Sequence, residues 1–235
     1  MKSVLSLLAV FSLVCSSAQA LDIAALERAM ANPDRPAADK ERDASRQAPA
    51  VLDFLGLEAG MTVLDVNASG GWYTEVLSYA VGPNGKVLMQ NRPGGNSAEA
   101  ATARANRLGN VEEWLTPISD APENSVDFAI TALNFHDFHN SNPAAAQGIL
   151  GQLMTVLKPG GILAVIDHKG TFGADNVSLH RIAFEDAVKA VLESGFVLAG
   201  ASDILHNEAD DHTVGPFDPS LGRNTDRLVL KFMKL

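Results

Sequence analysis

The chain has 235 residues, with 18 Lys and Arg against 28 Asp and Glu and a formal net charge of −10. A net-acidic surface argues against nucleic acid or an anionic membrane as a partner. The length suits one domain with a sizeable core.

Residues 1–20 have the pattern of a cleaved signal peptide. Lys2 is a short basic start, Val4 to Val14 is an apolar stretch too short to span a bilayer, and Ala18-Gln19-Ala20 is a small-residue cleavage pattern. We expect export to a bacterial periplasm or beyond, with an uncleaved membrane anchor as the alternative. The only cysteine lies in the removed segment, so the mature chain has no disulfide or thiolate chemistry.

Residues 21–56 are expected to form a helical segment ahead of the main domain, with helices over 22–31, 36–47 and 49–56. The helix over 36–47 is highly charged. We expect a solvated face supported by i,i+4 pairs. The alternative is a lid whose Arg and Asp side chains face a ligand cleft.

The segment from Thr62 to Thr74 is the most informative part of the chain. Thr62 to Val66 is short and apolar, as a central parallel strand is, and Asn67 to Gly71 has no bulky side chain. From Trp72 onward the apolar spacing is helical. A helix N-terminus behind such a turn presents free N–H groups to a ligand, which is how α/β folds hold nucleotides.

Strand and helix patterns alternate through the rest of the chain, which we assign as one α/β domain over 57–235. The alternation predicts a three-layer αβα architecture with a mainly parallel, seven-stranded sheet and right-handed crossovers. Further strands are expected over 86–90, 111–115, 126–133, 162–167, 196–205 and 228–233, and helices over 97–108, 143–157 and 177–194.

The strand and turn resemble the first motif of the class I S-adenosylmethionine-dependent methyltransferases, a strand ending in an acidic residue followed by Gly-x-Gly-x-Gly. Asp65 takes the acidic position and Gly71 the last glycine, whereas Asn67 and Ser69 replace the first two. Both replacements are small, and Asn tolerates a positive φ better than most residues, so the turn can form.

Later segments match the same family. Ser119 to Pro122 matches the loop in which an Asp contacts the adenine amine, and Asn124 to Ile130 matches the fourth strand with its leading Asp. Leu157 to Gly161 matches the turn before the fifth strand. Where family members usually carry an acidic residue for the ribose hydroxyls, this chain has Gln90-Asn91-Arg92.

The resemblance implies a Rossmann-like methyltransferase fold and methyl transfer from S-adenosylmethionine to a small-molecule acceptor. The alternative is an exported protein of this fold that has lost catalysis and binds a small ligand, because the first two glycines are missing and the cofactor is a cytosolic metabolite. The cofactor-binding residues are expected to be Asp65, Asn67, Ser69, Gly70, Gly71, Trp72, Tyr73, Asn91, Asp120 and Asn134.

All six histidines lie after the third expected strand, and several follow strand ends that share one sheet edge if the strands are parallel. His136 or His168 could be a general base, several with Asp137 and Asp167 could bind a transition metal, or all could be polar loop residues. The family commonly places acceptor-side residues at this strand end. We therefore expect His136 and Asp137 to be catalytic and no metal to be needed.

Other nucleotide and hydrolase motifs are missing from the sequence. A short-chain dehydrogenase needs a Tyr-x-x-x-Lys pair on a later helix, and the only tyrosines are Tyr73 and Tyr79. There is no Gly-x-Ser-x-Gly elbow and no P-loop.

Overall fold

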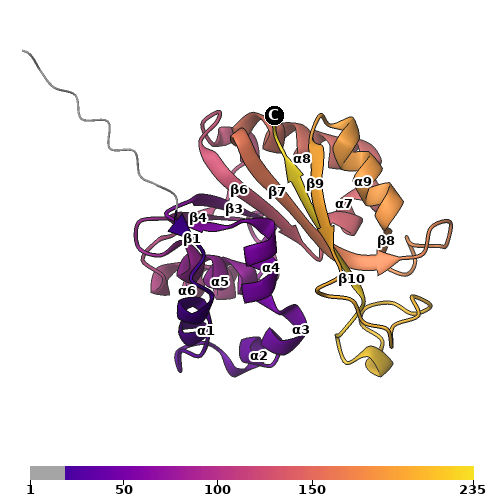
Figure 1. The fold of residues 1–235 in the computed structure, drawn as a ribbon, viewed down its shortest axis with the longest axis horizontal. Helices are drawn as coiled ribbons and strands as arrows, with labels where there is room; N and C mark the ends of the chain where they lie inside the picture. The colour runs from indigo at the N-terminus through magenta and orange to yellow at the C-terminus, as the bar shows by residue number, and fades with distance from the viewer. Residues whose placement is uncertain (1–18) are drawn as a thin grey trace, which may run out of the picture.

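The computed structural model describes residues 19–235, which form a mixed sheet of seven strands with helices on both faces (Figure 1). The strand order is β5-β4-β3-β6-β7-β10-β9. The first five strands in this order are mutually parallel, and β10 runs antiparallel between β7 and β9. The expected Rossmann-like methyltransferase fold with a mainly parallel sheet is confirmed. The strands are β3 (Thr62–Val66), β4 (Lys86–Gln90), β5 (Val111–Trp114), β6 (Val126–Ala132), β7 (Leu157–Gly170), β9 (Val197–Ser202) and β10 (Arg227–Met233).

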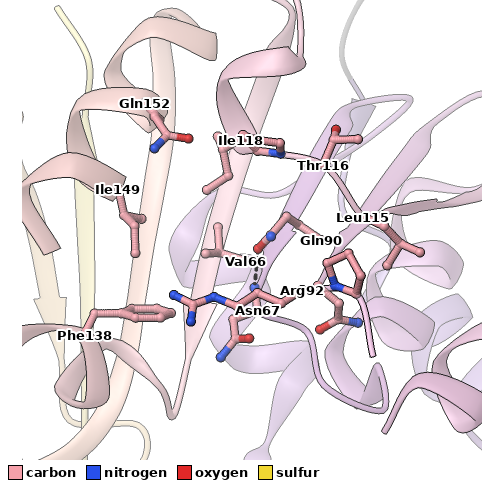
Figure 2. Close-up of a pocket in the computed structure, with 13 residues that line it drawn as sticks. Val66, Asn67, Gln90, Arg92, Leu115, Thr116, Ile118, Phe138, Ile149 and Gln152 are labelled. Atoms are coloured by element: carbon pink, nitrogen blue, oxygen red, sulfur yellow. Dashed lines mark hydrogen bonds between the residues drawn. The ribbon is translucent and has the colours of Figure 1, made fainter. Parts of the chain in front are cut away.

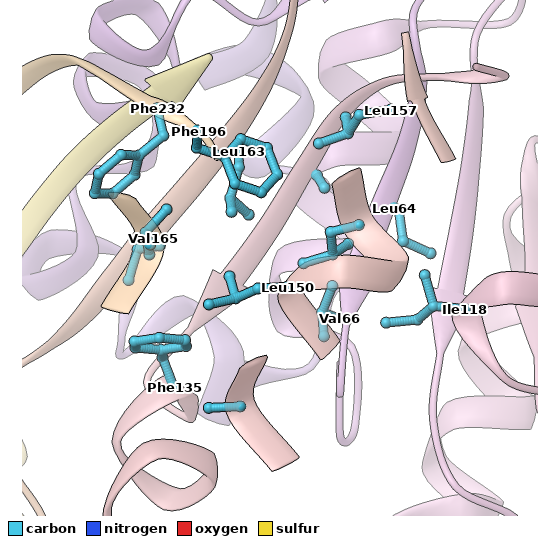
Figure 3. Close-up of a cluster of buried hydrophobic side chains, with 14 of the residues drawn as sticks. Leu64, Val66, Ile118, Phe135, Leu150, Leu157, Leu163, Val165, Phe196 and Phe232 are labelled. Atoms are coloured by element: carbon cyan, nitrogen blue, oxygen red, sulfur yellow. The ribbon is translucent and has the colours of Figure 1, made fainter. Parts of the chain in front are cut away.

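Two hydrophobic clusters pack against opposite faces of this sheet. Successive residues of a strand point to opposite faces, so Val63 joins the cluster under α1, α4 and α5, and Leu64 joins the cluster under α8 and α9. Figure 3 shows the second cluster, where Leu150 of α8 lies among side chains of the sheet. The main helices are α1 (Ile23–Met30), α4 (Ala48–Leu55), α5 (Trp72–Val81), α6 (Ala98–Arg107), α7 (Phe135–Ser141), α8 (Pro143–Val156) and α9 (Phe184–Glu193).

The expected helix over 177–194 is wrong in its first part. Residues 177–181 form a loop in which His180 has a φ of 50°, and the short strand β8 (Ile182–Ala183) pairs with the end of β7 before α9 begins. The buried side chain of Arg181 explains the loop, because its guanidinium bonds to Asp210 at 2.8 Å and to the carbonyls of Lys169 and Val214. These long-range bonds outweigh the local helical pattern.

Two other boundaries differ from the sequence expectation. The helix expected over 36–47 is two short helices, α2 (Ala37–Lys40) and α3 (Asp43–Arg46). Strand β7 begins at Leu157, passes through a register irregularity, and continues to Gly170. His168 therefore lies inside the strand rather than after it.

The first described residues form β1 (Gln19–Ala20), which pairs antiparallel with β2 (Glu58–Ala59). The expected signal peptide otherwise lies outside the described residues, and its cleavage site would fall directly after β1. No helix within residues 19–235 has the length and apolar character needed to cross a bilayer.

Candidate active site

The turn after β3 has the backbone of a glycine loop although two of its glycines are replaced. The φ angles are 50° at Asn67, 54° at Ser69 and 79° at Gly71, so all three residues are in the left-handed region. Asn adopts this region at low cost, whereas a serine there is strained and persists only where its surroundings hold it. The loop shape expected from the sequence is present.

Side chains at the end of β4 hold this loop from outside. Gln90 Oε1 accepts a hydrogen bond from the Asn67 N–H at 2.9 Å. Asn91 makes two bonds to Ser69, accepting from its N–H at 2.8 Å and donating to its carbonyl at 3.0 Å. The amides that replace the family's acidic residue thus brace the loop backbone.

A buried ionic network fixes the other side of the loop. Arg104 on α6 donates from Nε to the carbonyl of Gly70 at 2.7 Å and pairs with both Asp39 and Glu75. Glu75 is fully buried and also pairs with Arg107 at 2.7 Å. Burial alone would raise the pKa of Asp39, but the hydrogen bonds and charges of Arg104 and Arg42 lower it. Asp39 of the 36–47 segment therefore helps to anchor the loop, whereas Glu41 is exposed and Arg42 partly exposed, so the expected solvated face is only part of what this segment forms.

Trp72 and Tyr73 lie beneath the N-terminal helices rather than in an open cleft. Both are about 95% buried, and Trp72 Nε1 donates to the carbonyl of Asp39 at 3.0 Å. The guanidinium of Arg46 lies 4.4 Å from the Trp72 ring centroid, in position for a cation–π contact. These two residues position the start of α5, and the structure does not bring them to the cavity wall.

A cavity of about 290 Å³ opens beside the loop at the carboxyl ends of β3 and β4 (Figure 2). Its walls are mainly apolar, with amide and guanidinium groups at one side, as small-molecule sites usually are. Asp120 is exposed and is not part of the lining, although Ile118 of the same turn is. The lining includes Val66, Asn67, Gln90, Asn91, Arg92, Leu115, Ile118, Phe138, Ile149 and Gln152.

This lining fits the nucleoside part of S-adenosylmethionine. Val66, Ile118 and Ile149 supply apolar walls for a planar base, and the amides of Gln90 and Asn91 offer hydrogen bonds to hydroxyl groups. Among the described residues no carboxylate lines the cavity, so ribose recognition would depend on these neutral amides.

Asp65, the acidic residue of the motif, is buried beneath the loop. It accepts a hydrogen bond from Thr74 Oγ1 at 2.6 Å. Burial raises its pKa to about 7, although the Thr74 hydrogen bond and the charges of Arg46 and Arg104 oppose this shift. Asp65 thus supports the turn from below.

The raised pKa makes stability depend on pH. The folded protein holds a proton on Asp65 that the unfolded chain releases near pH 4, so this contribution to stability is lost as the pH rises through about 7. We expect Asp65→Asn to raise the free energy of unfolding of the cofactor-free protein at pH 8 by roughly 2–4 kcal/mol, and to change it little at pH 4. Denaturant titrations at both pH values measure this, and equal effects at both would contradict it.

The residues that the sequence predicts for the acceptor side lie in the segment after β6. Asn134 is buried, and its Nδ2 donates to the carbonyls of Val66 and Asn67 at 3.1 and 3.2 Å, which joins this segment to the loop after β3. His136 follows on α7, with its side chain 5% exposed. Asn134 therefore helps to hold the backbone of the loop after β3 in place.

Buried Asp167, inside β7, orients His136. Its Oδ1 accepts from His136 Nδ1 at 2.7 Å, and its Oδ2 accepts from the His136 backbone N–H at 2.7 Å. Burial lowers the pKa of His136, but the hydrogen bond and charge of Asp167 outweigh it and the pKa is raised. Nε2 is then the ring nitrogen that Asp167 does not contact, and Asp137 Oδ1 lies 3.2 Å from it.

Four of the other five histidines separate into two groups. His168 and His180 lie near His136, with ring centroids 5.7 and 5.8 Å from its ring. His168 is buried, and burial together with nearby Arg227 lowers its pKa well below the usual value. His206 and His212 contact Asp226 instead, at 3.1 and 2.9 Å. His139 lies apart from both groups, against Phe135 and Asn140, so the expected histidine rim does not gather at one place.

Sequence comparison gives one relative and no family model that matches the chain. The ubiquinone/menaquinone biosynthesis C-methyltransferase UbiE of Hahella chejuensis is 29% identical over 123 residues, which are 49% of this chain and 46% of that protein. The match therefore spans about half the length of this relative.

Comparison with solved structures shows the fold. A SAM-dependent methyltransferase from Aquifex aeolicus aligns with a TM-score of 0.64 and 24% identity, over 91% of this chain and 99% of that chain. The 1,6-didemethyltoxoflavin-N1-methyltransferase of Burkholderia thailandensis gives 0.57 and 17%, over 84% and 78%. The cyclase SpnF gives 0.61 and 19%, over 87% and 84%. This chain has the Rossmann-like methyltransferase fold.

Several residues of the site carry no local signal in the sequence. Arg104 looks like an ordinary charge on an Ala-rich helix, and Phe138 and Ile149 look like core residues. Their position follows only from the packing of α6, α7 and α8 around the sheet edge. Only the order of the strands and the packing of the helices at that edge could have identified these residues as part of the site.

Proposed function

We propose that the protein is an S-adenosylmethionine-dependent methyltransferase of class I that acts on a small-molecule acceptor. The observation that carries this proposal is the positive φ at Asn67, Ser69 and Gly71, which restores the glycine-loop backbone beside a cavity of suitable lining. The similarity to UbiE, a C-methyltransferase by its name, supports the same activity class.

In this proposal the cofactor supplies an electrophilic methyl group on a sulfonium. Asn67, Gln90 and Asn91 hold its nucleoside, and the cavity walls exclude water. With the cofactor bound, His136 Nε2 would accept the proton that the acceptor atom releases on methylation. Asp167 holds the proton of the neutral imidazole on Nδ1, so that Nε2 is the basic nitrogen, and Asp167 and Asp137 both stabilise the imidazolium that forms.

Calorimetric titration of the protein with S-adenosylmethionine and with S-adenosylhomocysteine tests the proposal. We expect saturable binding of both at one site and none of NAD, which shares only the adenosine part. If the titration gives no binding signal at millimolar cofactor, the alternative holds, in which the protein has this fold but has lost catalysis.

The degenerate alternative has one specific observation in its favour. The N–H groups of Asn67 and Ser69 already donate to Gln90 and Asn91, so a ligand must compete for them or bind without them. The cyclase SpnF shares this fold, which shows that the fold alone does not fix the activity. Binding of a small ligand without S-adenosylmethionine binding would favour this alternative.

Replacing His136 tests its role as a base. A histidine base contributes about 10²–10⁴-fold, so we expect His136→Ala to lower kcat at least tenfold and to leave the dissociation constant of S-adenosylmethionine nearly unchanged. Single-turnover kinetics and calorimetry measure the two quantities. Equal losses in both would mean that His136 only supports the fold.

We further propose that residues 1–20 are a signal peptide and that the mature protein is periplasmic or secreted. The basic start, the apolar stretch and the Ala18-Gln19-Ala20 pattern support this proposal. N-terminal sequencing of protein from separated cell fractions tests it, with Leu21 as the expected first residue. A cytosolic protein beginning at Met1 would contradict it.

A further inference from the structure

Three side chains from two segments bring metal-binding atoms together beside the acceptor side. His136 Nε2 lies 3.2 Å from Asp137 Oδ1, and His180 Nδ1 lies 3.5 Å from the same oxygen. All three atoms lie within 4.8 Å of one another. His136 and Asp137 are on α7, whereas His180 comes from the loop before β8.

These separations match the spacing of ligands around a small divalent cation. Ligand atoms about 2.0–2.1 Å from a tetrahedral zinc ion lie roughly 3.3 Å apart. Two imidazole nitrogens and a carboxylate oxygen are a usual donor set for such a metal, and three protein ligands leave one coordination position open.

The surroundings of His136 are those of a metal ligand. A ligating histidine normally donates its other ring N–H to a carboxylate, which fixes the tautomer and the ring orientation. Asp167 takes this part, since it is fully buried and accepts from Nδ1 at 2.7 Å. It also accepts from the backbone N–H groups of His136 and His168. The orientation of Nε2 toward Asp137 is therefore fixed before any ligand binds.

The loop that presents His180 is held in a strained conformation. His180 has a φ of 50°, and strain of this kind persists when the surroundings impose it and is common at functional sites. The next residue, Arg181, is fully buried, and Asn140 of α7 donates to its carbonyl at 2.9 Å. This bond ties the loop to α7, the helix that carries the other two residues of the cluster.

We propose that His136, Asp137 and His180 bind one divalent transition metal ion of the zinc class. The Nε2 lone pair of His136 cannot hold a metal and accept a proton at the same time, so a bound metal competes with the proton transfer proposed above. This competition rests on the proposed function, whereas metal binding itself does not.

Titration of the full untagged protein, stripped of metal with a chelator, tests the site with Co²⁺ as a spectroscopic probe. We expect the visible absorption of low-symmetry Co²⁺ to saturate at one equivalent and to be displaced by one equivalent of Zn²⁺. His180→Ala should weaken Co²⁺ binding at least tenfold. His180 is about half exposed, so this variant should fold, and circular dichroism with thermal melting checks that it does.

His206→Ala is the matched control, because His206 also lies beside a carboxylate, 3.1 Å from Asp226 Oδ1, outside the cluster. It should bind Co²⁺ as the wild type does. The proposed metal site would be wrong if no Co²⁺ absorption appeared, or if His206→Ala lost Co²⁺ binding and His180→Ala kept it.

Calorimetry with S-adenosylmethionine on the same samples tests the proposed function separately. In an active preparation Zn²⁺ should lower turnover and a chelator should restore it, whereas activation by Zn²⁺ would overturn the competition.

Discussion

Gly71→Val is expected to lower the free energy of unfolding by about 2–5 kcal/mol and to abolish S-adenosylmethionine binding. Gly71 has a φ of 79°, which costs a residue with a Cβ about 1–2 kcal/mol. A Cβ at this position would also lie 2.5 Å from Met89 Cε and 2.9 Å from Arg104 Cδ. Overpacking of this kind adds about 1–3 kcal/mol.

Gly70→Ala is the matched control for this prediction. No atom lies within 4 Å of a Cβ built on Gly70, and its φ is outside the left-handed region, so we expect its stability to equal that of the wild type. Urea denaturation of the three proteins measures the difference. A loss in Gly71→Val no larger than that in Gly70→Ala would show that neither the positive φ nor the contacts with Met89 and Arg104 make glycine necessary at this position.

The sequence pointed to Gly71 for a different reason, the close approach of its backbone to a ligand. The structure shows that protein side chains already fill the space beside it. The need for glycine could be predicted from the strand–turn–helix pattern, because that pattern is local. Met89 and Arg104 could not be identified as its neighbours, because they reach the turn through tertiary packing.

The same distinction explains the rest of the fold. Strand β3 and helix α5 were predictable because apolar runs and glycine turns report directly on local structure. The loop over 177–181 was missed because the long-range bonds of Arg181 override a helical pattern. The charged segment over 36–47 was misinterpreted in part, because a charge pattern alone does not show whether its partners lie on the same helix.

In the candidate site, the position of some predicted residues could be inferred from the sequence and that of others could not. His136 and Asp137 do lie together at the sheet edge, since both follow the end of one parallel strand. Trp72 and Tyr73 are adjacent to the loop in sequence, but the N-terminal helices cover them. The placement of that segment depends on the ion pairs of Arg104, which connect residues far apart in the chain.

Arg104→Met is expected to lower the free energy of unfolding by up to about 3 kcal/mol, because Arg104 pairs with two buried carboxylates and the remaining partners, Arg42 and Arg107, compensate them only in part. Arg104 pairs with Asp39 and Glu75, whose side chains are 5% and 0% exposed. It also holds the carbonyl of Gly70, so we expect weaker binding of S-adenosylmethionine as well. Denaturant titration and calorimetry measure the two effects.

Two comparisons distinguish the loss of stability caused by an unpaired buried charge from the loss caused by breaking any salt bridge. Lys86→Met breaks the pair with Glu112, in which both side chains are about half exposed, and should cost less than about 1 kcal/mol. Adding Glu75→Gln to Arg104→Met removes one of the two carboxylates that lost Arg104 as a partner, so the double variant should lose less stability than the sum of the two single variants. If instead Arg104→Met costs no more than Lys86→Met, water must reach Asp39 and Glu75 in the folded protein. The N-terminal helices would then be a mobile cover over the loop, and the cofactor affinity of Arg104→Met would match that of the wild type.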